Sequence, residues 1–201
     1  KHIICYVKEQ GLFCFDDRKQ EFVSLKNDLP DDIRNFVIDS KDRIFFLTGH
    51  GQLLHYQLTV RNSCPELSFK EEIRHCAPVS NIYLSQDCLI INDDRTLTVS
   101  QDNRILDSIN IPENKTVSQA ICHGEYLLIS FIEGGCIRYN LENGTSTELL
   151  QLPEKASIFT IYIGSQNILW VGTDGQGILE VYEHSSPFHT VKTNYPVRCF
   201  C

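Results

Sequence analysis

The sequence contains no methionine and only one tryptophan among its 201 residues. No apolar stretch approaches the roughly 20 residues that a helix needs to span a bilayer, and the longest apolar runs, such as residues 44–47 and 126–129, have the length of a strand. A signal peptide is also missing. The simplest interpretation is a mature or excised piece of a longer protein, without direct membrane contact of its own.

Clusters of basic residues are missing as well. The 18 lysines and arginines are scattered, and the formal net charge is −8. A nucleic-acid surface needs clustered cations for its phosphate contacts, so this composition argues against a nucleic-acid partner. An acidic surface favours solubility, and a neutral or cationic ligand fits the overall charge better than an anionic one.

Cysteine is abundant, but a CxxC motif is absent. Most of the nine cysteines lie inside apolar runs, as Cys5, Cys14 and Cys122 do, and there a free thiol acts as a small hydrophobic residue. We therefore expect free thiols in the core, with disulfides or a metal site as the alternatives. A chain of this length can bury a core without a disulfide framework.

Internal repeats organise the chain. Five segments each show an apolar run, a short turn and a second apolar run, which is the pattern of a β-hairpin. They are residues 2–15, 43–56, 88–99, 126–139 and 168–182. Equivalent positions in them, Tyr6, Leu47, Asn92, Ser130 and Gly172, are 41, 45, 38 and 42 residues apart. A unit of four strands needs about 40–45 residues.

Each hairpin is flanked by further segments that resemble strands. Apolar segments lie at residues 33–39, 79–85, 117–123, 158–164 and 197–201, and more polar ones at 21–25, 67–70, 104–107, 146–151 and 188–191. Sustained helical periodicity is absent. One four-stranded sheet cannot bury both of its faces, so neighbouring units must pack face to face around an axis. The prediction is an all-β fold: β-propeller blades of four antiparallel strands, in about five repeats.

The predicted blades lie at about residues 2–25, 33–70, 77–110, 117–151 and 157–192, followed by the inner strand of a next blade at residues 197–201. The chain therefore starts in the second strand of a blade and ends after a first strand. Pairing of these ends would give a closed five-bladed ring without open edges. The alternative, which we favour, is a fragment of a larger propeller.

One repeat resembles a known family. Residues 167–182, NILWVGTDGQGILEVY, resemble the repeat of the two-component regulator propeller family, with matches at Trp170, Gly172, Thr173, Asp174, Gly175 and Gly177. Residues 33–56 and 126–140 match more loosely, and the unit that contains residues 92–95 departs most. The resemblance extends over essentially the whole chain.

In that family the repeats form the periplasmic sensor region of Bacteroides-type hybrid two-component system histidine kinases. The resemblance implies a periplasmic location, in the extracytoplasmic part of an inner-membrane protein. It also implies an oligosaccharide ligand released from glycans, a homodimer of the parent sensor, and a kinase outside this chain. Ligand binding would shift an equilibrium that the kinase reads, and this chain itself is expected not to be an enzyme.

Ligand-binding residues are predicted in the turns between the second and third strands of the blades. In a propeller these turns ring one end of the central channel, where ligands usually bind. They supply side chains that can hydrogen-bond a sugar: His50, Gln52, Asp94, Arg95, Glu133, Asp174 and Gln176. The alternative is that these residues are ordinary solvated turn residues.

Motifs of catalytic, metal and cofactor sites are missing. Adjacent carboxylates such as Asp93 and Asp94 lie in turns, where they diverge, whereas glycosidases hold two carboxylates across a bond. GxSxG, HExxH and a phosphate-binding glycine loop are absent. We therefore expect no catalytic residue, no metal and no cofactor. Trp170 and the hairpin tyrosines are expected to pack between sheets: Tyr6, Tyr56, Tyr139 and Tyr182.

Two other functions stay open at this point. A protein-interaction scaffold of the WD-repeat or kelch kind would share the architecture, although the WD-repeat signature of Gly-His and Trp-Asp in each blade is not seen. A propeller glycan hydrolase or lyase would need acidic residues that converge on the channel. Measured binding of an oligosaccharide would favour a sensor over a protein-interaction scaffold. Turnover of the same oligosaccharides would identify an enzyme.

Overall fold

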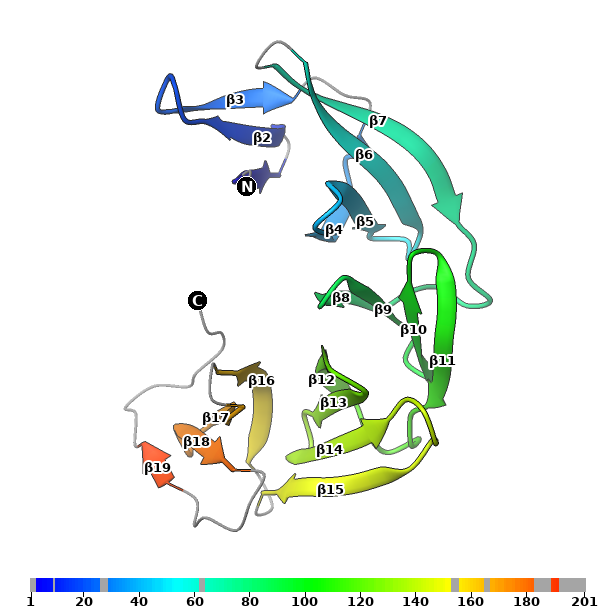
Figure 1. Ribbon diagram of the computed structural model, residues 1–201, viewed down its shortest axis with the longest axis vertical. Coiled ribbons are helices and arrows are strands. Elements are labelled where there is room, and N and C mark those ends of the chain that lie inside the picture. Colours follow the sequence, from blue (N-terminus) through cyan, green and yellow to red (C-terminus); the bar gives the residue numbers. More distant parts are fainter. Residues whose placement is uncertain are drawn as a thin grey trace. The chain divides into compact units, whose positions relative to one another are not determined.

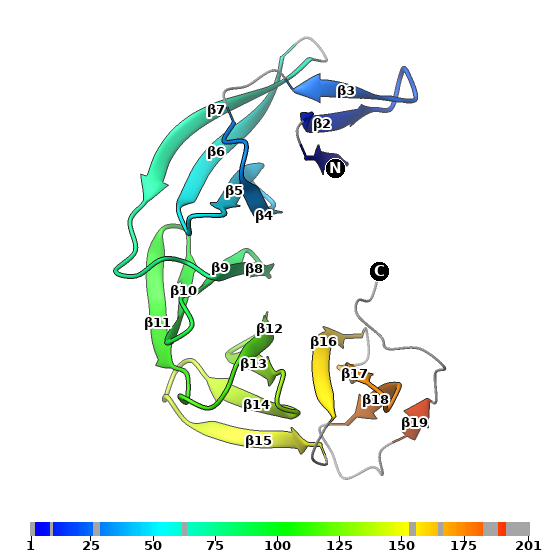
Figure 2. The same ribbon diagram turned by 180° about the vertical axis from the view of Figure 1, so that it is seen from behind.

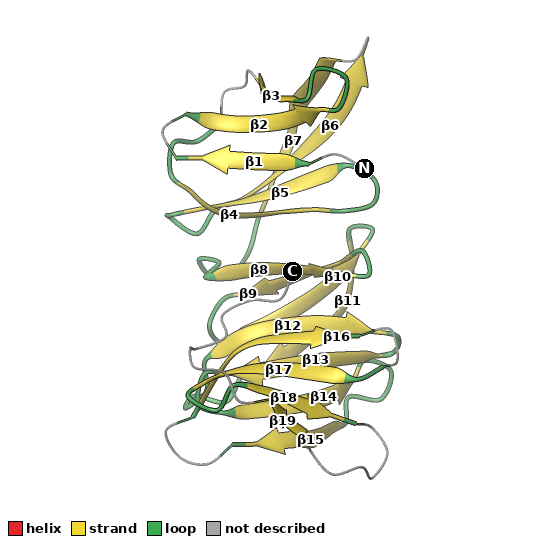
Figure 3. Ribbon diagram, turned by 90° about the vertical axis from the view of Figure 1, so that its left-hand side faces the viewer, coloured by secondary structure: helices red, strands yellow, loops and turns green. Residues whose placement is uncertain are grey.

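The structure is a computed structural model that describes residues 3–8, 10–25, 29–61, 64–152, 156–164, 167–182 and 189–191. These residues form strands, turns and loops (Figure 3). In this part of the chain there is no helix with the length and apolar character needed to cross a membrane. The chain divides into two compact units, Lys1–Ile82 and Tyr83–Cys201, which are described separately.

The first unit contains two antiparallel sheets in which strands adjacent in sequence are paired (Figure 1). One sheet consists of β1 (Ile4–Val7), β2 (Gly11–Asp16) and β3 (Glu21–Leu25). The other consists of β4 (Ile33–Ile38), β5 (Arg43–Thr48), β6 (Leu53–Arg61) and β7 (Cys64–Ile73).

The core of the first unit is a cluster shared by these two sheets. On β2, Leu12 and Cys14 are buried and alternate with half-buried residues, the period of two expected for a strand with one face in a core. They belong to one cluster with Phe46 and Tyr56, whose rings meet edge to face at 5.3 Å between centroids. Tyr6 packs against the same cluster, so Tyr6 and Tyr56 are core residues as expected.

A buried carboxylate shapes the turn between β4 and β5. Asp39 Oδ1 accepts hydrogen bonds from the backbone N–H groups of Lys41 and Arg43, both at 2.9 Å, and Oδ2 pairs with the Arg43 guanidinium. Asp42 has a φ of 58°, a left-handed conformation that aspartate and asparagine tolerate better than most residues. The Asp-Ser-Lys-Asp segment of the repeat therefore has a structural role in the turn.

The second unit contains three antiparallel sheets. The first is β8 (Asn81–Ser85), which crosses the boundary between the units, with β9 (Cys88–Asn92), β10 (Thr96–Gln101) and β11 (Arg104–Asn110). The second is β12 (Val117–His123), β13 (Tyr126–Phe131), β14 (Gly135–Asn140) and β15 (Ser146–Gln151). The third is β16 (Ser157–Ile163), β17 (Leu169–Asp174), β18 (Ile178–Val181) and β19 (His189–Val191). Figure 2 shows these sheets from behind.

The central strand β13 is apolar on both faces because a sheet covers each of them. On β13, Leu127 and Ile129 belong to the cluster shared with β9 and β10, whereas Leu128 belongs to the cluster shared with β16 and β17. All three side chains are buried. A strand covered on both sides reads as a continuous apolar run instead of an alternating one, which explains the sequence pattern at residues 126–129.

The innermost strands β4, β12 and β16 each contain a bulge after their first residues. In β4 and β12, the polar side chain that follows the bulge contacts the next sheet. In the first unit, Asn35 Nδ2 donates to Asn81 Oδ1 at 2.8 Å and to the Ile82 carbonyl at 3.1 Å. In the second unit, Gln119 Oε1 accepts from Thr160 Oγ1 at 2.9 Å and from the Ile161 N–H at 2.7 Å. Neighbouring inner strands are thus linked by hydrogen bonds at an equivalent position.

The predicted all-β fold of four-stranded antiparallel sheets is confirmed. The first sheet has three strands among the residues that the structure describes. The predicted inner strand at residues 197–201 lies outside the described residues, so the choice between a closed ring and a fragment stays open, and the division into numbered blades stays a prediction.

Six cysteines have free thiols in the part of the chain that the structure describes. Cys14, Cys88, Cys122 and Cys136 are buried, and the other two, at positions 5 and 76, are exposed. Burial raises the pKa of the Cys136 thiol to about 12. Burial also raises the pKa of the Cys122 thiol. The neighbouring Cys88 sulfur raises this pKa further, through its charge and a hydrogen bond.

These environments predict which thiols react. The thiolate is the reactive form, and a thiol with a pKa of about 12 is almost entirely protonated at pH 8. We expect an alkylating reagent at pH 8 to modify Cys5 and Cys76 rapidly, and Cys122 and Cys136 only after unfolding in denaturant. Peptide mapping by mass spectrometry measures this. Alkylation of folded Cys136 as fast as Cys76 would contradict the burial.

Candidate functional site

The predicted ligand-binding turns follow β5, β9, β13 and β17. The strand register pairs Ile33 with Thr48, Val117 with Phe131 and Ser157 with Asp174. Three of the turns therefore lie beside the start of the innermost strand of their own sheet, as the prediction required.

In the first unit, the turn carries His50 and Gln52 on either side of Gly51, whose φ is 78°. His50 Nε2 lies 3.8 Å from Asp32 Oδ2, and its side chain is 87% exposed. Gln52 is exposed and donates from Nε2 to Glu72 Oε1 at 3.3 Å. Both side chains are accessible to a ligand.

In the second unit, Asp94 and Arg95 are exposed, and hydrogen bonds from their backbone N–H groups to Asn92 Oδ1 and Asp93 Oδ1 shape the turn. Glu133 accepts a hydrogen bond from the Thr116 N–H at 2.8 Å. Its partial burial would raise the pKa of the carboxyl, but the hydrogen bonds with Thr116 outweigh this and hold it below its ordinary value. Glu133 is therefore an anion tied to a backbone group.

The last two predicted residues lie at the end of β17. Asp174 is the final residue of the strand, and Gln176 lies between Gly175 and Gly177, both with positive φ. Both side chains are exposed. No hydrogen bond or ion pair joins any two of the seven predicted residues, all of which the structure describes. Ligand binding by these turns stays a prediction.

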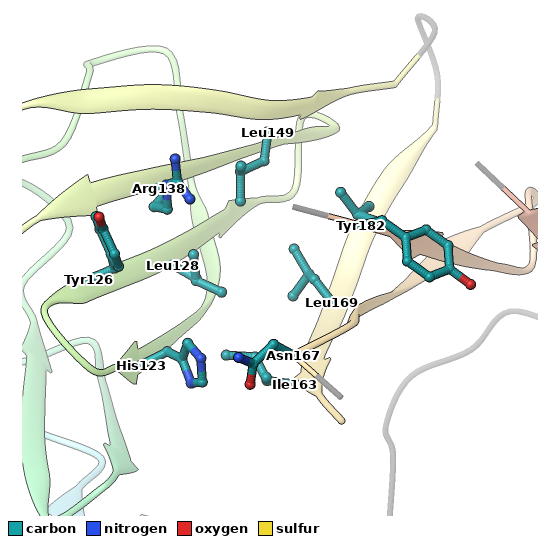
Figure 4. A pocket seen from close by; sticks show the side chains of 10 residues that line it. His123, Tyr126, Leu128, Arg138, Leu149, Ile163, Asn167, Leu169 and Tyr182 are labelled. Carbon is teal, nitrogen blue, oxygen red and sulfur yellow. The ribbon is translucent and has the colours of Figure 1, made fainter. Parts of the chain in front are cut away.

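A pocket lies at the opposite end of the second and third sheets of the second unit, between β12–β15 and β16–β18 (Figure 4). Its cavity volume is about 30 Å³, far below the ~300–1,000 Å³ of pockets that enclose a drug-sized ligand, and it opens to solvent on one side. Its apolar wall is formed by Leu128, Leu149, Ile163, Leu169 and Val181. Its polar and aromatic groups are His123, Tyr126, Arg138, Asn167 and Tyr182.

Arg138 and Tyr126 form one side of this pocket. They lie on the neighbouring strands β14 and β13, and the guanidinium carbon is 4.8 Å from the centre of the tyrosine ring. The Tyr126 hydroxyl is hydrogen-bonded to Glu125, which raises the pKa of this tyrosine. The cation is therefore stacked on an aromatic face, an arrangement that orients the guanidinium plane.

Asn167 and Tyr182 belong to the opposite side. Asn167 lies in the turn between β16 and β17 with a φ of 58°, and its N–H donates to the Gly164 carbonyl at 3.1 Å. Its side chain is exposed. The Tyr182 hydroxyl donates to Glu180 Oε2 at 2.8 Å, and this bond raises the pKa of Tyr182. Backbone and hydroxyl contacts thus position both side chains.

This pocket cannot be recognised from the sequence, because its residues come from turns and strand ends of two different repeats. Tyr182 was expected in the core, but it is half-buried and lines the pocket. Tyr139 packs against a buried cluster as expected. Trp170 is half-buried, whereas its neighbours Leu169 and Val171 belong to the buried cluster of that sheet. The pairing of an arginine with a tyrosine on adjacent strands is the one sequence signal that could have pointed here.

Within the described residues there is no group of three or more histidine, cysteine, aspartate or glutamate side chains placed to hold a metal ion. The polar groups of the pocket are an amide, an imidazole, a guanidinium and two phenols. This set can donate and accept hydrogen bonds and can contact the apolar face of a ring.

Residues 151–175 match the model of the family described as two component regulator propeller. The matched segment overlaps residues 167–175, on which the resemblance noted in the sequence was based, and that resemblance is confirmed. Among curated proteins, none matches this sequence.

Solved structures share the fold. The extracellular domain of a proposed one component system from B. thetaiotaomicron has a TM-score of 0.69 at 16% identity, over 96% of this chain and 26% of that chain. Virginiamycin B lyase from Staphylococcus aureus has a TM-score of 0.66 at 14% identity, over 96% of this chain and 70% of that chain. A streptogramin B lyase has a TM-score of 0.65 at 13% identity, over 91% of this chain and 62% of that chain. These are β-propeller proteins, and at such identities the likeness establishes the fold alone.

Proposed function

We propose that this chain, which carries a two component regulator propeller repeat at residues 151–175, is part of the extracytoplasmic ligand-sensing region of a hybrid two-component regulator. In this proposal the parent protein is a homodimeric sensor of the inner membrane, and this part lies in the periplasm. The ligand is an oligosaccharide derived from a glycan. The kinase that reads the signal lies outside this chain.

The repeat match is the observation that carries the proposal. The structural likeness to an extracellular domain over 96% of this chain supports the compartment, although that chain is about four times longer. The accessible turn residues and the pocket of the second unit supply amides, carboxylates and aromatic faces, the groups from which sugar-binding sites are built.

Signalling requires that the ligand bind one arrangement of the sensor more tightly than another. A ligand that binds both arrangements equally tightly does not shift their equilibrium. To change the ratio of the two populations from 1:99 to 99:1, the ligand must bind the favoured arrangement about 10⁴-fold more tightly than the other. A pocket whose walls belong to two different sheets suits this role, because its binding free energy depends on how the two sheets are spaced.

The lyases with the same fold provide a second candidate, a propeller enzyme. The sensor proposal and this candidate differ in what happens to the ligand after binding. A sensor returns its ligand unchanged, whereas a lyase consumes it.

A panel of glycan-derived oligosaccharides, neutral and acidic, tests the proposal. We expect calorimetry with the full chain to detect saturable, stoichiometric binding of at least one of them, and chromatography of the mixture after prolonged incubation to recover that sugar intact. Absence of binding across the panel would contradict the sensing function. Conversion of the bound sugar to products would instead support the second candidate, a propeller enzyme.

A further inference from the structure

Two buried cysteines meet between the first and second sheets of the second unit. Cys88 is the first residue of β9, and Cys122 is the last residue but one of β12. Both belong to the buried cluster that these sheets share, with exposed fractions of 7% and 2%. Their thiols are hydrogen-bonded to each other. Two sulfur atoms from different repeats are therefore in contact across the interface between two sheets.

The other buried cysteines that the structure describes have different surroundings. Cys14 Sγ contacts the Phe15 carbonyl oxygen at 3.8 Å, and burial is the cause of the raised pKa of Cys136. Among the four buried cysteines in the described ranges, a contact between two thiols occurs only at Cys88 and Cys122. Two thiols in contact can close an intramolecular disulfide, which a single buried thiol cannot do.

Hydrogen bonds join the backbones of the two sheets around this pair. The Ser85 hydroxyl donates to the Cys122 carbonyl at 2.9 Å, and the Gly124 N–H donates to Gln86 Oε1 at 3.0 Å. A disulfide needs Cβ atoms about 3.5–4.5 Å apart. Because the backbones are fixed beside the thiols, the two side chains stay within reach of each other, and pairing with a distant cysteine is disfavoured.

The two thiols differ as nucleophiles. Burial raises the pKa of the Cys88 thiol, whereas its hydrogen bond with Cys122 lowers it. At Cys122, burial and the Cys88 sulfur both raise the pKa. Cys88 also follows directly on the turn at Gln86 and Asp87, and a turn opens locally more easily than the whole fold. Cys88 is therefore the thiol that an external reagent reaches first and that ionises first.

We propose that Cys88 and Cys122 are a site of reversible oxidative modification, at which a disulfide oxidant links β9 to β12 through an intramolecular disulfide. The structure describes the reduced form of this pair. The proposal goes beyond the sensing function and does not depend on it, because it concerns two side chains of the fold and an external disulfide.

The reaction is thiol–disulfide exchange in two steps. The Cys88 thiolate attacks one sulfur of the external disulfide, whose S–S bond breaks, and a mixed disulfide forms as the first thiolate leaves. The Cys122 thiolate then attacks the Cys88 sulfur and releases the second thiolate. The two cysteines lose two electrons and two protons, and the external disulfide is reduced to two thiols.

The disulfide would close the loop of residues 88–122, which contains β10 and β11. Such a crosslink stabilises a fold mainly because it restricts the unfolded chain. For a chain of this size, the oxidised form should unfold at a temperature roughly 5–15 °C higher than the reduced form. Addition of a phosphine reductant should abolish the difference.

Oxidised glutathione at pH 8 is the probe, applied in dilute solution to the full chain in two ways. One sample is oxidised while folded, and the other while it refolds from urea, because buried thiols exchange slowly in the folded chain. Free thiols are then blocked with N-ethylmaleimide in denaturant. Tandem mass spectrometry of the unreduced peptides should find Cys88 linked to Cys122 in at least half of the chains of one sample.

Three variants test the assignment. Cys88→Ala and Cys122→Ala should each abolish the difference in unfolding temperature between the oxidised and reduced forms. Cys136→Ala is the matched control, because it removes a buried thiol of the same unit that has no thiol partner, and it should keep the difference. Each variant is compared with its own reduced form, so the stability lost through the substitution itself cancels.

The peptide map decides the proposal even if a variant fails to fold. A link between Cys88 and Cys122, together with an unfolding temperature that falls on reduction, supports it. If neither sample contains this link, or if Cys122 is linked mainly to another cysteine, the proposal is wrong. It is also wrong if Cys88→Ala keeps the temperature difference or if Cys136→Ala loses it.

Discussion

Replacement of Gly134 by alanine is expected to lower the free energy of unfolding by about 3 kcal/mol, from roughly 1–2 kcal/mol of left-handed backbone strain and a similar overpacking cost. Gly134 lies in the turn between β13 and β14 with a φ of 87°. A Cβ there would lie 2.5 Å from the Ala156 carbonyl oxygen and 3.2 Å from Leu152 Cβ. Because the nearest atom belongs to the backbone, a side-chain rotation cannot relieve the contact.

Urea denaturation of the full chain measures this effect, with Gly175→Ala as the control. Gly175 occupies the corresponding turn of the next sheet with a φ of 84°, but an added Cβ there meets nothing within 4 Å. The control should lose only about 1–2 kcal/mol, the cost of the conformation itself. Equal losses for the two variants would show that the carbonyl of Ala156 moves away readily.

Replacement of Gln119 by methionine is expected to cost about 2 kcal/mol of stability. Methionine has a similar size and shape, so the change mainly removes the amide oxygen that accepts from Thr160 Oγ1 and the Ile161 N–H. A backbone N–H that loses its partner in a partly buried place costs about 1–3 kcal/mol. The effect should appear as a lower urea midpoint with an unchanged m-value.

Gln101→Met is the control for this change. Gln101 is exposed at the end of β10 and makes one long hydrogen bond, 3.5 Å to the Gln86 carbonyl, so its replacement should stay within about 0.5 kcal/mol. A double-mutant cycle of Gln119→Met with Thr160→Val should show a coupling energy. Additive effects, or a Gln119→Met variant as stable as the control, would rule out the link between the inner strands.

The two predictions concern the same end of the same two sheets. Near the starts of β12 and β16, the sheets are joined through Gln119, and the Gly134 carbonyl accepts from the Leu152 N–H at 2.7 Å. Near the ends of these strands lies the pocket.

The hairpins could be predicted from the sequence because their signals are local. The apolar run at residues 126–129 reflects a strand covered on both faces, and Asp39 and Asp42 build a tight turn through their own neighbours. Such features depend on residues a few positions apart. Each repeat therefore contains these local signals in full, and they recur about every 40 residues.

The contacts between repeats could not be predicted in this way. Asn35 and Gln119 are isolated polar residues in apolar strands, and their partners lie 46 and 42 residues further along the chain. The pocket likewise combines Arg138 and Tyr126 of one sheet with Asn167 and Tyr182 near the next. Tyr182 fitted a core position by its place in the repeat, but its side chain is half-buried and borders the pocket.

The sequence by itself determined the strands, their order in each sheet and the repeat that matches the two component regulator propeller family, because pattern and turn chemistry act over short distances. Tertiary structure alone decided which polar groups join the sheets and where the pocket of the second unit forms. The physical reason is that hydrogen bonds and electrostatic complementarity depend on the separation of atoms in space, and two repeats bring their residues together only after each has folded and packed on its neighbour.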